Sequence, residues 1–379
     1  MSGDELRSTT ELRRLNRNRV YRALYTAGGP VTKQDLARTL SMSLPTLTQN
    51  LKELLSRGLV DDSETTESTG GRKPRLFAVV SGARFAVGGE LTNSQIRLTA
   101  IDLEIRQLGH KVIARPFGNN ADYAKALADE LEVFLDENGL DRRKLLGVGL
   151  TLPGIVNEAQ SIIEYAPTVN VRKMSVNQLT RFIPYPVFLE NDATCGGFAE
   201  WWTHAGAERA NMAYLSLGRG VGGAILVDGR PYLGTHRRSA EFGHMCIHPG
   251  GRVCNCGKRG CLEAYCSASC LFEPAGVSLD EFFTNLMQGN PKCGAIWSDY
   301  LDNLATGVLN IHAALDCDVV IGGVVSQYLE AYLNELKARL AVVDVFGEEG
   351  NYVHLCRFHS RSSSIGAALY YVKDYIDGI

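Results

Sequence analysis

The chain has 379 residues, of which 45% are hydrophobic and 21% are charged, and its formal net charge is -3. This length suggests two or three domains, and the composition is that of a globular protein with sizeable cores rather than a disordered or fibrous chain. No apolar run approaches the roughly 20 residues that cross a bilayer, and the N-terminus has no apolar signal-peptide core. We therefore expect a cytoplasmic protein without a membrane partner.

The charge is divided unevenly along the chain. Residues 1–80 contain 13 Lys and Arg against 9 Asp and Glu, whereas the remaining residues carry a net charge of -7. A basic head on an acidic body suits a polyanionic partner for the head alone. We therefore expect one domain at 1–80 and another at 81–379.

The head is predicted to consist of three helices and a hairpin. Apolar residues recur at helical spacing over 12–24, ahead of a Gly-Gly-Pro stop. Thr32 is placed to cap a second helix over 33–40, and a third helix runs from about Leu44 to Arg57. Two helices joined by the short turn at 41–43 make a helix-turn-helix, whose second helix enters the major groove of DNA.

The DNA-contacting side chains are predicted from this third helix and from a wing that follows Gly58. Apart from one proline, the outward residues of the helix are hydrogen-bonding or basic, as contacts to base edges and phosphates require. The basic Gly-Arg-Lys-Pro-Arg tip of the wing suits a minor groove, whose negative potential attracts arginine. The alternative is a helical protein-interaction module with a charged hairpin. The expected contacts are Ser43, Pro45, Thr46, Thr48, Gln49, Lys52, Arg72, Lys73 and Arg75.

From about Arg84 onward, strands alternate with helices, which indicates an α/β protein. Two units that each begin with a β-hairpin, near Phe85 and near Ala213, predict a duplicated fold with a central cleft, where ligands usually bind. The expected strands are Phe85–Glu90, Ile96–Asp102, Leu146–Leu152, Val187–Glu190, Ala213–Leu217, Gly223–Val227, Asp318–Ile321 and Tyr352–Cys356. The expected helices are Ala121–Asn138, Thr194–His204, Leu279–Met287 and Ala295–Ala314.

A cysteine-rich knuckle predicts a structural zinc site. His244 precedes Cys254, Cys256 and Cys261 at metal-ligand spacing. One imidazole and three thiolates complete a tetrahedral shell and leave no position open for catalysis. In a reducing cytosol, clustered cysteines favour metal binding over disulfides. His248 is a competing ligand, and a group of buried free thiols is the alternative.

Six segments carry a family resemblance, and together they extend over almost the whole chain. They are Leu12–Val20, Ser68–Pro74, Leu189–Ala193, Glu241–His244, Gly260–Glu263 and Val320–Gly323. In these segments the chain resembles the ROK family (repressors, open reading frames and kinases), in particular its sugar-responsive transcriptional repressors. The resemblance implies an N-terminal winged helix-turn-helix joined to a duplicated actin-like, or hexokinase-like, ATPase fold.

The resemblance also implies a sugar site. In the family's sugar-binding members, carboxylates and amides pair with the sugar hydroxyls, each of which is both donor and acceptor. The residue that matches Asp192 is the general base of the family's kinases. The sequence before Asn170 departs from the usual family pattern. The matching positions are Gly154, Asn170, Asn191, Asp192, Glu241, His244 and Glu263.

The phosphate-binding turns of the family's kinases are only partly kept. The first usually reads Asp-x-Gly-Gly-Thr, but here Gly88–Ser94 places Leu, Thr and Asn side chains where bare backbone must leave space for phosphate. The second turn keeps its glycines and has Arg219 in place of a hydroxyl residue. We therefore expect no enzymatic activity and a vestigial base at Asp192.

These features predict a sugar-responsive repressor of carbohydrate-utilisation genes that binds a DNA operator, a sugar effector and structural Zn²⁺. In a homodimer or homotetramer, sugar binding is expected to shift the two lobes and change the spacing of the heads on half-sites roughly 34–36 Å apart. One alternative is an ATP-dependent sugar kinase, of the glucokinase or N-acetylhexosamine kinase type, that carries a DNA-binding head. Another is a zinc-sensing regulator, although a closed zinc shell argues against ion exchange.

Overall fold

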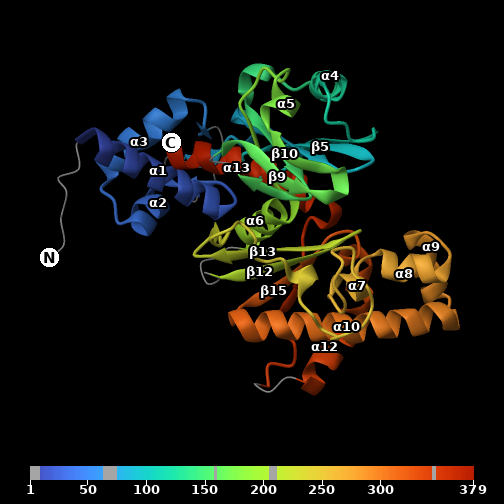
Figure 1. Cartoon of the computed structure of the whole chain (residues 1–379). Coiled ribbons are helices and arrows are strands. Elements are labelled where there is room, and N and C mark those ends of the chain that lie inside the picture. The colour runs from blue at the N-terminus through green and yellow to red at the C-terminus, as the bar shows by residue number, and fades with distance from the viewer. Residues whose placement is uncertain (1–8, 63–74, 158–159, 205–210, 344–346) are drawn as a thin grey trace.

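The computed structural model describes residues 9–62, 75–157, 160–204, 211–343 and 347–379. These residues form an N-terminal head beside a body of two lobes (Figure 1). Among them, no helix has both the length and the apolar character needed to cross a membrane.

The head contains the predicted helix-turn-helix. Its helices are α1 (Thr9–Ala27), α2 (Lys33–Leu40) and α3 (Leu44–Ser56), and its strands are β1 (Val31–Thr32), β2 (Val60–Asp61) and β3 (Leu76–Val79). The side chains of Thr32 and Ser43 cap α2 and α3 by accepting from the backbone N–H groups of Asp35 and Thr46. Strand β3 pairs antiparallel with both β1 and β2, so the strands that flank the tip of the wing are present.

The first lobe is built on a five-stranded sheet with the order β11-β7-β4-β5-β6. Strands β4 (Phe85–Leu91), β5 (Gln95–Asp102) and β6 (Gln107–Ala114) form an antiparallel meander, and β7 (Leu145–Leu152) and β11 (Val187–Asn191) add in parallel beside β4. Helix α4 (Ala121–Glu137) joins β6 to β7 and buries Leu127 and Leu131 against the sheet. A small sheet of β8 (Ile155–Asn157), β9 (Ile162–Ala166) and β10 (Val171–Ser175), followed by α5 (Asn177–Thr180), precedes β11.

The second lobe repeats this topology, with the strand order β14-β13-β12-β15-β16. Strands β12 (Met212–Leu217), β13 (Val221–Val227) and β14 (Arg230–Pro231) form the meander, and β15 (Asp318–Gly322) and β16 (Val353–Leu355) add in parallel. Helix α10 (Pro291–Leu315) lies before β15, as α4 lies before β7. The shorter helices of this lobe are α7 (Glu263–Cys266), α8 (Ser269–Ala275), α9 (Leu279–Met287), α11 (Ser326–Leu329) and α12 (Leu333–Val343). The predicted duplication is therefore confirmed.

The last strand of each sheet leads into a helix, and these two helices pack against each other. Helix α6 (Asp192–His204) follows β11, and α13 (Ser362–Gly378) follows β16 (Figure 1). A Cβ atom at Gly366 of α13 would lie 1.8 Å from the carbonyl oxygen of Cys195 in α6. A Cβ atom at Gly88 of β4 would lie 1.7 Å from the carbonyl oxygen of Ser364. Glycine is needed at both positions because α13 lies directly against α6 and the first sheet.

The head is packed on these two helices. Buried side chains of α1, including Val20 and Leu24, belong to the same hydrophobic cluster as Phe198 of α6 and Leu369 and Ile376 of α13. Figure 1 shows the red C-terminal helix ending beside the blue helices of the head. The domain boundary near residue 80 stays a prediction, because one hydrophobic cluster extends across it.

Candidate effector site and metal site

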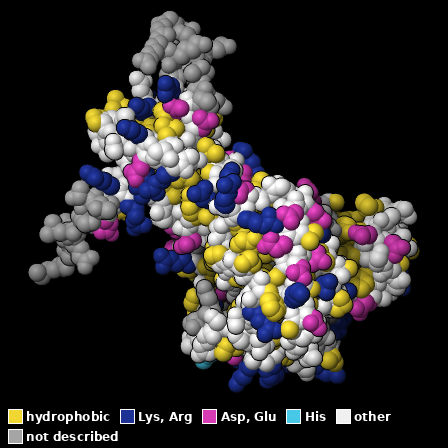
Figure 2. All heavy atoms as spheres, turned by 90° about the horizontal axis from the view of Figure 1, so that it is seen from above, with side chains coloured by type: hydrophobic (Ala, Val, Ile, Leu, Met, Phe, Trp, Pro, Cys, Tyr) yellow, Lys and Arg dark blue, Asp and Glu magenta, His cyan; other side chains and the backbone are white. Residues whose placement is uncertain are grey.

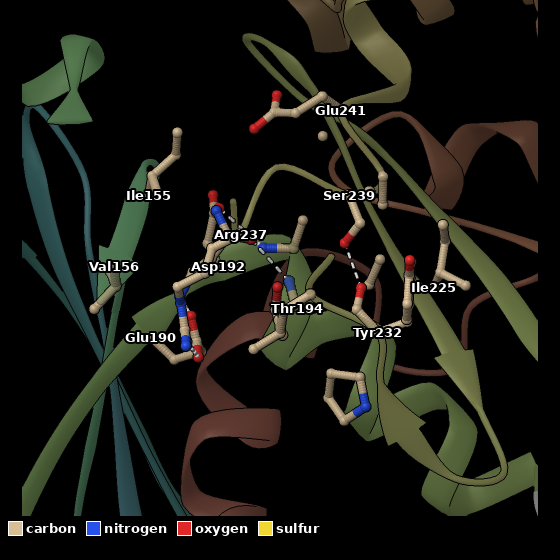
Figure 3. Close-up of a pocket in the computed structure, with 18 of the residues that line it drawn as sticks. Ile155, Val156, Glu190, Asp192, Thr194, Ile225, Tyr232, Arg237, Ser239 and Glu241 are labelled. Carbon is tan, nitrogen blue, oxygen red and sulfur yellow. Dashed lines mark hydrogen bonds and ion pairs between the residues drawn. The ribbon is translucent and has the colours of Figure 1, made fainter. Parts of the chain in front are cut away.

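A cavity of about 70 Å³ lies between the two lobes. The first lobe contributes β8, the end of β11 and the start of α6, and the second contributes β13 and the segment 231–241. Figure 3 shows Ile155 and Val156 on one side and Tyr232 and Ser239 on the other. Four of the predicted sugar-binding residues line this cavity, namely Gly154, Asn191, Asp192 and Glu241.

The junction of β11 with α6 positions the residues at the bottom of the cavity. The Asn191 amide nitrogen donates to the Gly154 carbonyl oxygen, and its amide oxygen accepts from the Thr194 backbone N–H, both at 2.9 Å. Asn191 is therefore the side chain that caps α6, and the helix begins at Asp192 rather than at Thr194. Asp192 Oδ1 accepts from the backbone N–H of Ala193 at 2.9 Å.

Asp192 has the electrostatic character of a proton acceptor near neutral pH. Burial raises the pKa of Asp192 to about 6, and the carboxylates of Glu90 and Glu241 contribute in the same direction. A carboxyl group with a pKa near the working pH is suited to general-base chemistry or to accepting a hydrogen bond from a sugar hydroxyl.

An ion pair that the sequence analysis missed crosses the cavity. Arg237 Nη2 donates to Glu190 Oε2 at 3.2 Å, and Glu190 Oε1 accepts from the backbone N–H of Asn191 at 2.8 Å. Arg237 and Ala240 have φ of 54° and 59°, in the left-handed region that non-glycine residues rarely adopt. No local motif identifies Arg237, because only the fold brings residues 190 and 237 together.

The other three predicted sugar-binding residues, Asn170, His244 and Glu263, are outside the lining of the cavity. Asn170 is exposed and follows a short 3₁₀ turn with φ of 54°. Glu263 Oε2 accepts from the Val221 backbone N–H at 2.9 Å, and its Oε1 lies 3.7 Å from Cys254 Sγ. The structure therefore does not bring these three to the cavity wall, and their contact with a sugar stays a prediction.

The knuckle brings together the four predicted metal ligands, His244, Cys254, Cys256 and Cys261, whose ligand atoms all lie within 4.8 Å of one another. His244 Nδ1 is 3.8 Å from Cys254 Sγ, and the Sγ atoms of Cys256 and Cys261 are 3.8 Å apart. The competing His248 instead pairs through Nε2 with Asn303 Oδ1 at 2.6 Å. An imidazole with three sulfur atoms in this arrangement is able to hold a metal ion.

The ring of His244 joins the metal cluster to the cavity. While its Nδ1 faces Cys254, its Nε2 lies 4.0 Å from Glu241 Oε2. Glu241 in turn lines the cavity, and Figure 3 shows its carboxylate at the side opposite Glu190. The imidazole of the metal cluster therefore lies next to a residue of the cavity wall.

The first of the two glycine-rich turns, between β4 and β5, is closed on itself. The Thr92 backbone N–H donates to the Gln95 carbonyl at 2.9 Å, and Thr92 Oγ1 accepts from the backbone N–H groups of Ser94 and Gln95 at 3.4 and 3.0 Å. Next to this turn, Glu90 pairs with Arg97 at 3.1 Å. A phosphate bound here would have to displace these bonds, which agrees with the predicted loss of the phosphate turn.

The second turn, between β12 and β13, is held partly by the knuckle. The Gly218 backbone N–H donates to the Gly220 carbonyl at 2.9 Å, and the Val221 backbone N–H donates to Glu263 Oε2 at 2.9 Å. Arg219 is exposed at the tip of this turn. One carboxylate thus links the glycine-rich turn to the segment that follows the last cysteine.

The head presents the predicted recognition residues of α3 to solvent. Figure 2 shows Lys and Arg side chains at several places on the surface, interspersed with Asp and Glu. Lys33, which the sequence analysis missed, donates from Nζ to Thr48 Oγ1 at 3.1 Å, so a basic group of α2 lies beside the recognition helix. All six predicted contacts of this region are exposed, namely the N-cap Ser43 and, within α3, Pro45, Thr46, Thr48, Gln49 and Lys52.

The predicted wing contacts are described only in part. Arg75 is exposed and pairs with Asp62 at 2.5 Å. Arg72 and Lys73 lie outside the residues that the structure describes. The base of the wing therefore carries one exposed guanidinium, and the contacts of its tip stay a prediction.

The model of the ROK family matches residues 87–374. The chain belongs to the ROK family. It is 27% identical over 250 residues to the xylose repressor of Bacillus subtilis (strain 168), a match that covers 64% of each chain. The alignment thus spans less than two thirds of the length of that relative.

Solved structures of ROK proteins confirm the fold. A ROK family transcriptional regulator, a homologue of the E. coli MLC protein, superposes with a TM-score of 0.76 at 22% identity and covers 97% of each chain. The ROK hexokinase from Thermus thermophilus superposes with a TM-score of 0.60 at 28% identity and covers 76% of this chain and 99% of its own. The family therefore includes both regulators and kinases on this α/β fold.

Proposed function

We propose that this ROK protein is a sugar-responsive DNA-binding regulator that represses carbohydrate-utilisation genes. The proposal rests on one observation: an exposed recognition helix and an interlobe cavity lined by carboxylates belong to a single packed unit. The repressors among its relatives support the same function. An operator in chromosomal DNA would place the protein in the cytoplasm.

A sugar kinase with a DNA-binding head is the second candidate. The observation that favours it is Asp192, which stands at the base position of the family's kinases with a pKa raised to about 6. Against it, the N–H groups of Thr92, Ser94 and Gln95 are already used within the first turn. Phosphoryl transfer depends almost entirely on positioning and charge stabilisation of the phosphates, so a closed turn removes an essential part.

Helix α6 provides a direct route from the cavity to the head. Its first residue, Asp192, lines the cavity, and near its other end Trp202 Nε1 donates to Tyr25 Oη of α1 at 3.3 Å. The cavity is small beside the roughly 300–1,000 Å³ of most small-molecule pockets, so entry of a sugar ring should move its walls apart. A shift of α6 would move Trp202 and, through its hydrogen bond, displace Tyr25 of the head. In a homodimer or homotetramer this displacement would change the spacing of the heads.

We propose Zn²⁺ as the ion of the knuckle, because sulfur and imidazole donors in a four-ligand shell favour it. Bound to His244 Nδ1, the ion would fix the ring and leave the proton on Nε2, toward Glu241. The test is the zinc content of purified protein, with Cys256→Ala as the variant and Cys246→Ala, an exposed cysteine outside the cluster, as the control. We expect stoichiometric zinc in the parent and the control, and both zinc and sugar response lost in Cys256→Ala. Zinc retained in Cys256→Ala would exclude this cluster.

One set of assays distinguishes the regulator from the kinase. A thermal-shift screen of sugars identifies the ligand, because a ligand at 100 times its Kd adds roughly 2.7 kcal/mol to stability. The identified sugar should change operator affinity in a gel-shift assay and should give no ADP in a coupled assay with ATP. Steady ADP release with no effect of the sugar on DNA binding would replace the regulator with the kinase.

A further inference from the structure

The knuckle contains a fourth thiol, that of Cys246, which is not one of the four metal-ligand residues. Cys246 is exposed, whereas Cys261, one of the four ligand residues, is only 1% exposed. The two cysteines face each other in an isolated antiparallel β-bridge. An accessible sulfur is thus paired through the backbone with a buried sulfur of the metal site.

The hydrogen bonds on either side of this bridge define its geometry. The backbone N–H of the residue after each cysteine donates to the carbonyl of the residue before the other cysteine, in both cases at 2.8 Å. Cys246 and Cys261 are therefore a non-hydrogen-bonded antiparallel pair, in which the Cα atoms lie about 4.5 Å apart and the side chains project to the same side. Because disulfides join Cα atoms roughly 4.4–6.8 Å apart, the backbone already holds this pair within disulfide range.

The sulfur of Cys246 lies against the segment that leads to Cys261. Its Sγ is 3.8 Å from the carbonyl oxygen of Arg259, and a Cβ atom at Gly260 would lie 3.2 Å from the same sulfur. The thiol is therefore both open to solvent and directed along the neighbouring strand. Accessible thiols that lie next to a second cysteine are the ones that oxidise to disulfides most readily.

Given the metal site proposed above, we propose that Cys246 is an oxidation site at which hydrogen peroxide removes Cys261 from the metal shell. The O–O bond of the peroxide breaks at the Cys246 sulfur, which becomes a sulfenic acid as one water leaves. The Cys261 sulfur attacks that sulfur, an S–S bond forms, the S–O bond breaks, and the departing hydroxide takes a proton from solvent. The two sulfurs lose two electrons in all, and the peroxide is reduced to two waters.

Oxidation at Cys246 has a consequence for the effector site. Loss of Cys261 leaves three donors, which do not complete the closed tetrahedral shell of a structural metal site. His244, whose Nδ1 is 3.8 Å from Cys254 Sγ and whose Nε2 is 4.0 Å from Glu241, is then no longer fixed by an ion. Since Glu241 lines the interlobe cavity, oxidation of the exposed thiol loosens one wall of that cavity. A dithiol reductant with added zinc reverses the change by thiol–disulfide exchange.

The experiment exposes the full-length, zinc-loaded protein to hydrogen peroxide and follows zinc release with a chromogenic chelator and disulfides by peptide mapping. The parent should lose zinc and yield a Cys246–Cys261 disulfide, and dithiothreitol with added zinc should restore the metal and the thiols. In Cys246→Ser, which keeps all four ligands, zinc release should be about fivefold slower or more. The matched control Cys317→Ser removes a half-buried thiol outside the knuckle and should behave as the parent does.

Three results would overturn the proposal. Zinc loss from Cys246→Ser at the parental rate would show that the ligand thiols are oxidised directly, since the sulfurs of Cys256 and Cys261 are 3.8 Å apart. Parent protein that releases zinc without a Cys246–Cys261 disulfide, or that keeps both its zinc and its thiols under peroxide, would also contradict it. Reduced protein that contains no zinc yet forms this disulfide would remove only the proposed metal and would support the oxidation site.

Discussion

Helices α6 and α13 occupy equivalent places in the two lobes, yet they are attached to the rest of the molecule in different ways. Helix α6 starts at the cavity with Asp192 and meets the head through apolar packing and through a hydrogen bond from Trp202 to Tyr25. Helix α13 is held at both ends, at its start by the buried Glu200 in the last part of α6 and at its end by Arg17 of the head. On the proposed function, α6 would be the helix that responds to the ligand, and α13 would be the firmer support of the head.

If the head moves with α13, a ligand-driven shift of α6 changes the relative position of the two supports beneath α1. Coupling of this kind needs a difference in stiffness between the two attachments, not a long chain of contacts.

The attachment at the start of α13 should be the strongest. Glu200 is fully buried and accepts from the backbone N–H groups of Arg357 and Phe358 at 2.7 and 3.2 Å and from the Ser362 hydroxyl at 2.8 Å. Glu200→Ala would leave these donors unsatisfied, at a cost of about 1–3 kcal/mol for each buried group, so we expect a loss of on the order of 4 kcal/mol in the free energy of unfolding. Urea unfolding measures this loss, and Glu200→Gln, which keeps one acceptor oxygen, should lose less. An unchanged midpoint for Glu200→Ala would show that α13 is not fixed from α6.

The attachment at the end of α13 should come next. Arg17, which is 8% exposed, donates to the carbonyl of Ile379 at 2.5 Å and forms an ion pair with Glu53. Arg17→Ala should cost about 2–3 kcal/mol, because it removes charge-assisted bonds from a buried position. The matched control is Arg22→Ala, which breaks the exposed ion pair with Asp377 between the same helices and should cost less than about 1 kcal/mol. Thermal unfolding measures the two losses of stability. Equal losses in Arg17→Ala and Arg22→Ala would show that the buried bonds of Arg17 do not hold the end of α13 more firmly than an exposed ion pair.

A substitution at the start of α6 should have the opposite effect on the free energy of unfolding, because the Asp192 carboxylate lowers stability at neutral pH while it contributes to sugar binding. The pKa of Asp192 is raised to about 6, so the folded protein binds a proton more readily than the unfolded chain, and stability falls as pH rises from about 4 to 6. Asp192→Asn should therefore gain on the order of 2 kcal/mol at pH 7 while losing sugar binding. The gain should vanish at pH 4, where the parent carboxyl is protonated too. A variant less stable than the parent at pH 7 would show that the Asp192 carboxylate supports the fold.

The sequence predicted one of these helices and missed the other. Local signals were strong for α2 and α9, whose observed bounds agree with the predicted ones. Helix α13 begins with three serines and contains Gly366, and it is buried on several faces, so it shows neither helix-forming composition nor a single apolar stripe. At the site, the family resemblance pointed to Asp192 and Glu241, but residues 190 and 237 are brought together only by tertiary folding.

The smallest effect on stability, and the most specific one on function, is expected at the contact of α6 with the head. Trp202→Phe removes the hydrogen bond to Tyr25 and keeps an aromatic ring in the same cluster, so it should change stability by less than about 1 kcal/mol. If this contact transmits the ligand signal, the sugar-induced change in operator affinity should fall about threefold, while sugar affinity and operator affinity without sugar stay unchanged.

The control for that prediction is the neighbouring tryptophan. Trp201 stacks on Phe198 and lies against Gly229, so Trp201→Phe alters the same end of α6 without touching the Tyr25 hydroxyl. It should leave the sugar effect on DNA binding intact. If both variants weaken the effect equally, the signal depends on the general packing of α6, and the division between a helix that supports the head and a helix that responds to the ligand fails. If Trp202→Phe alone weakens the sugar effect on DNA binding, the hydrogen bond from Trp202 to Tyr25 transmits the ligand signal from α6 to the head.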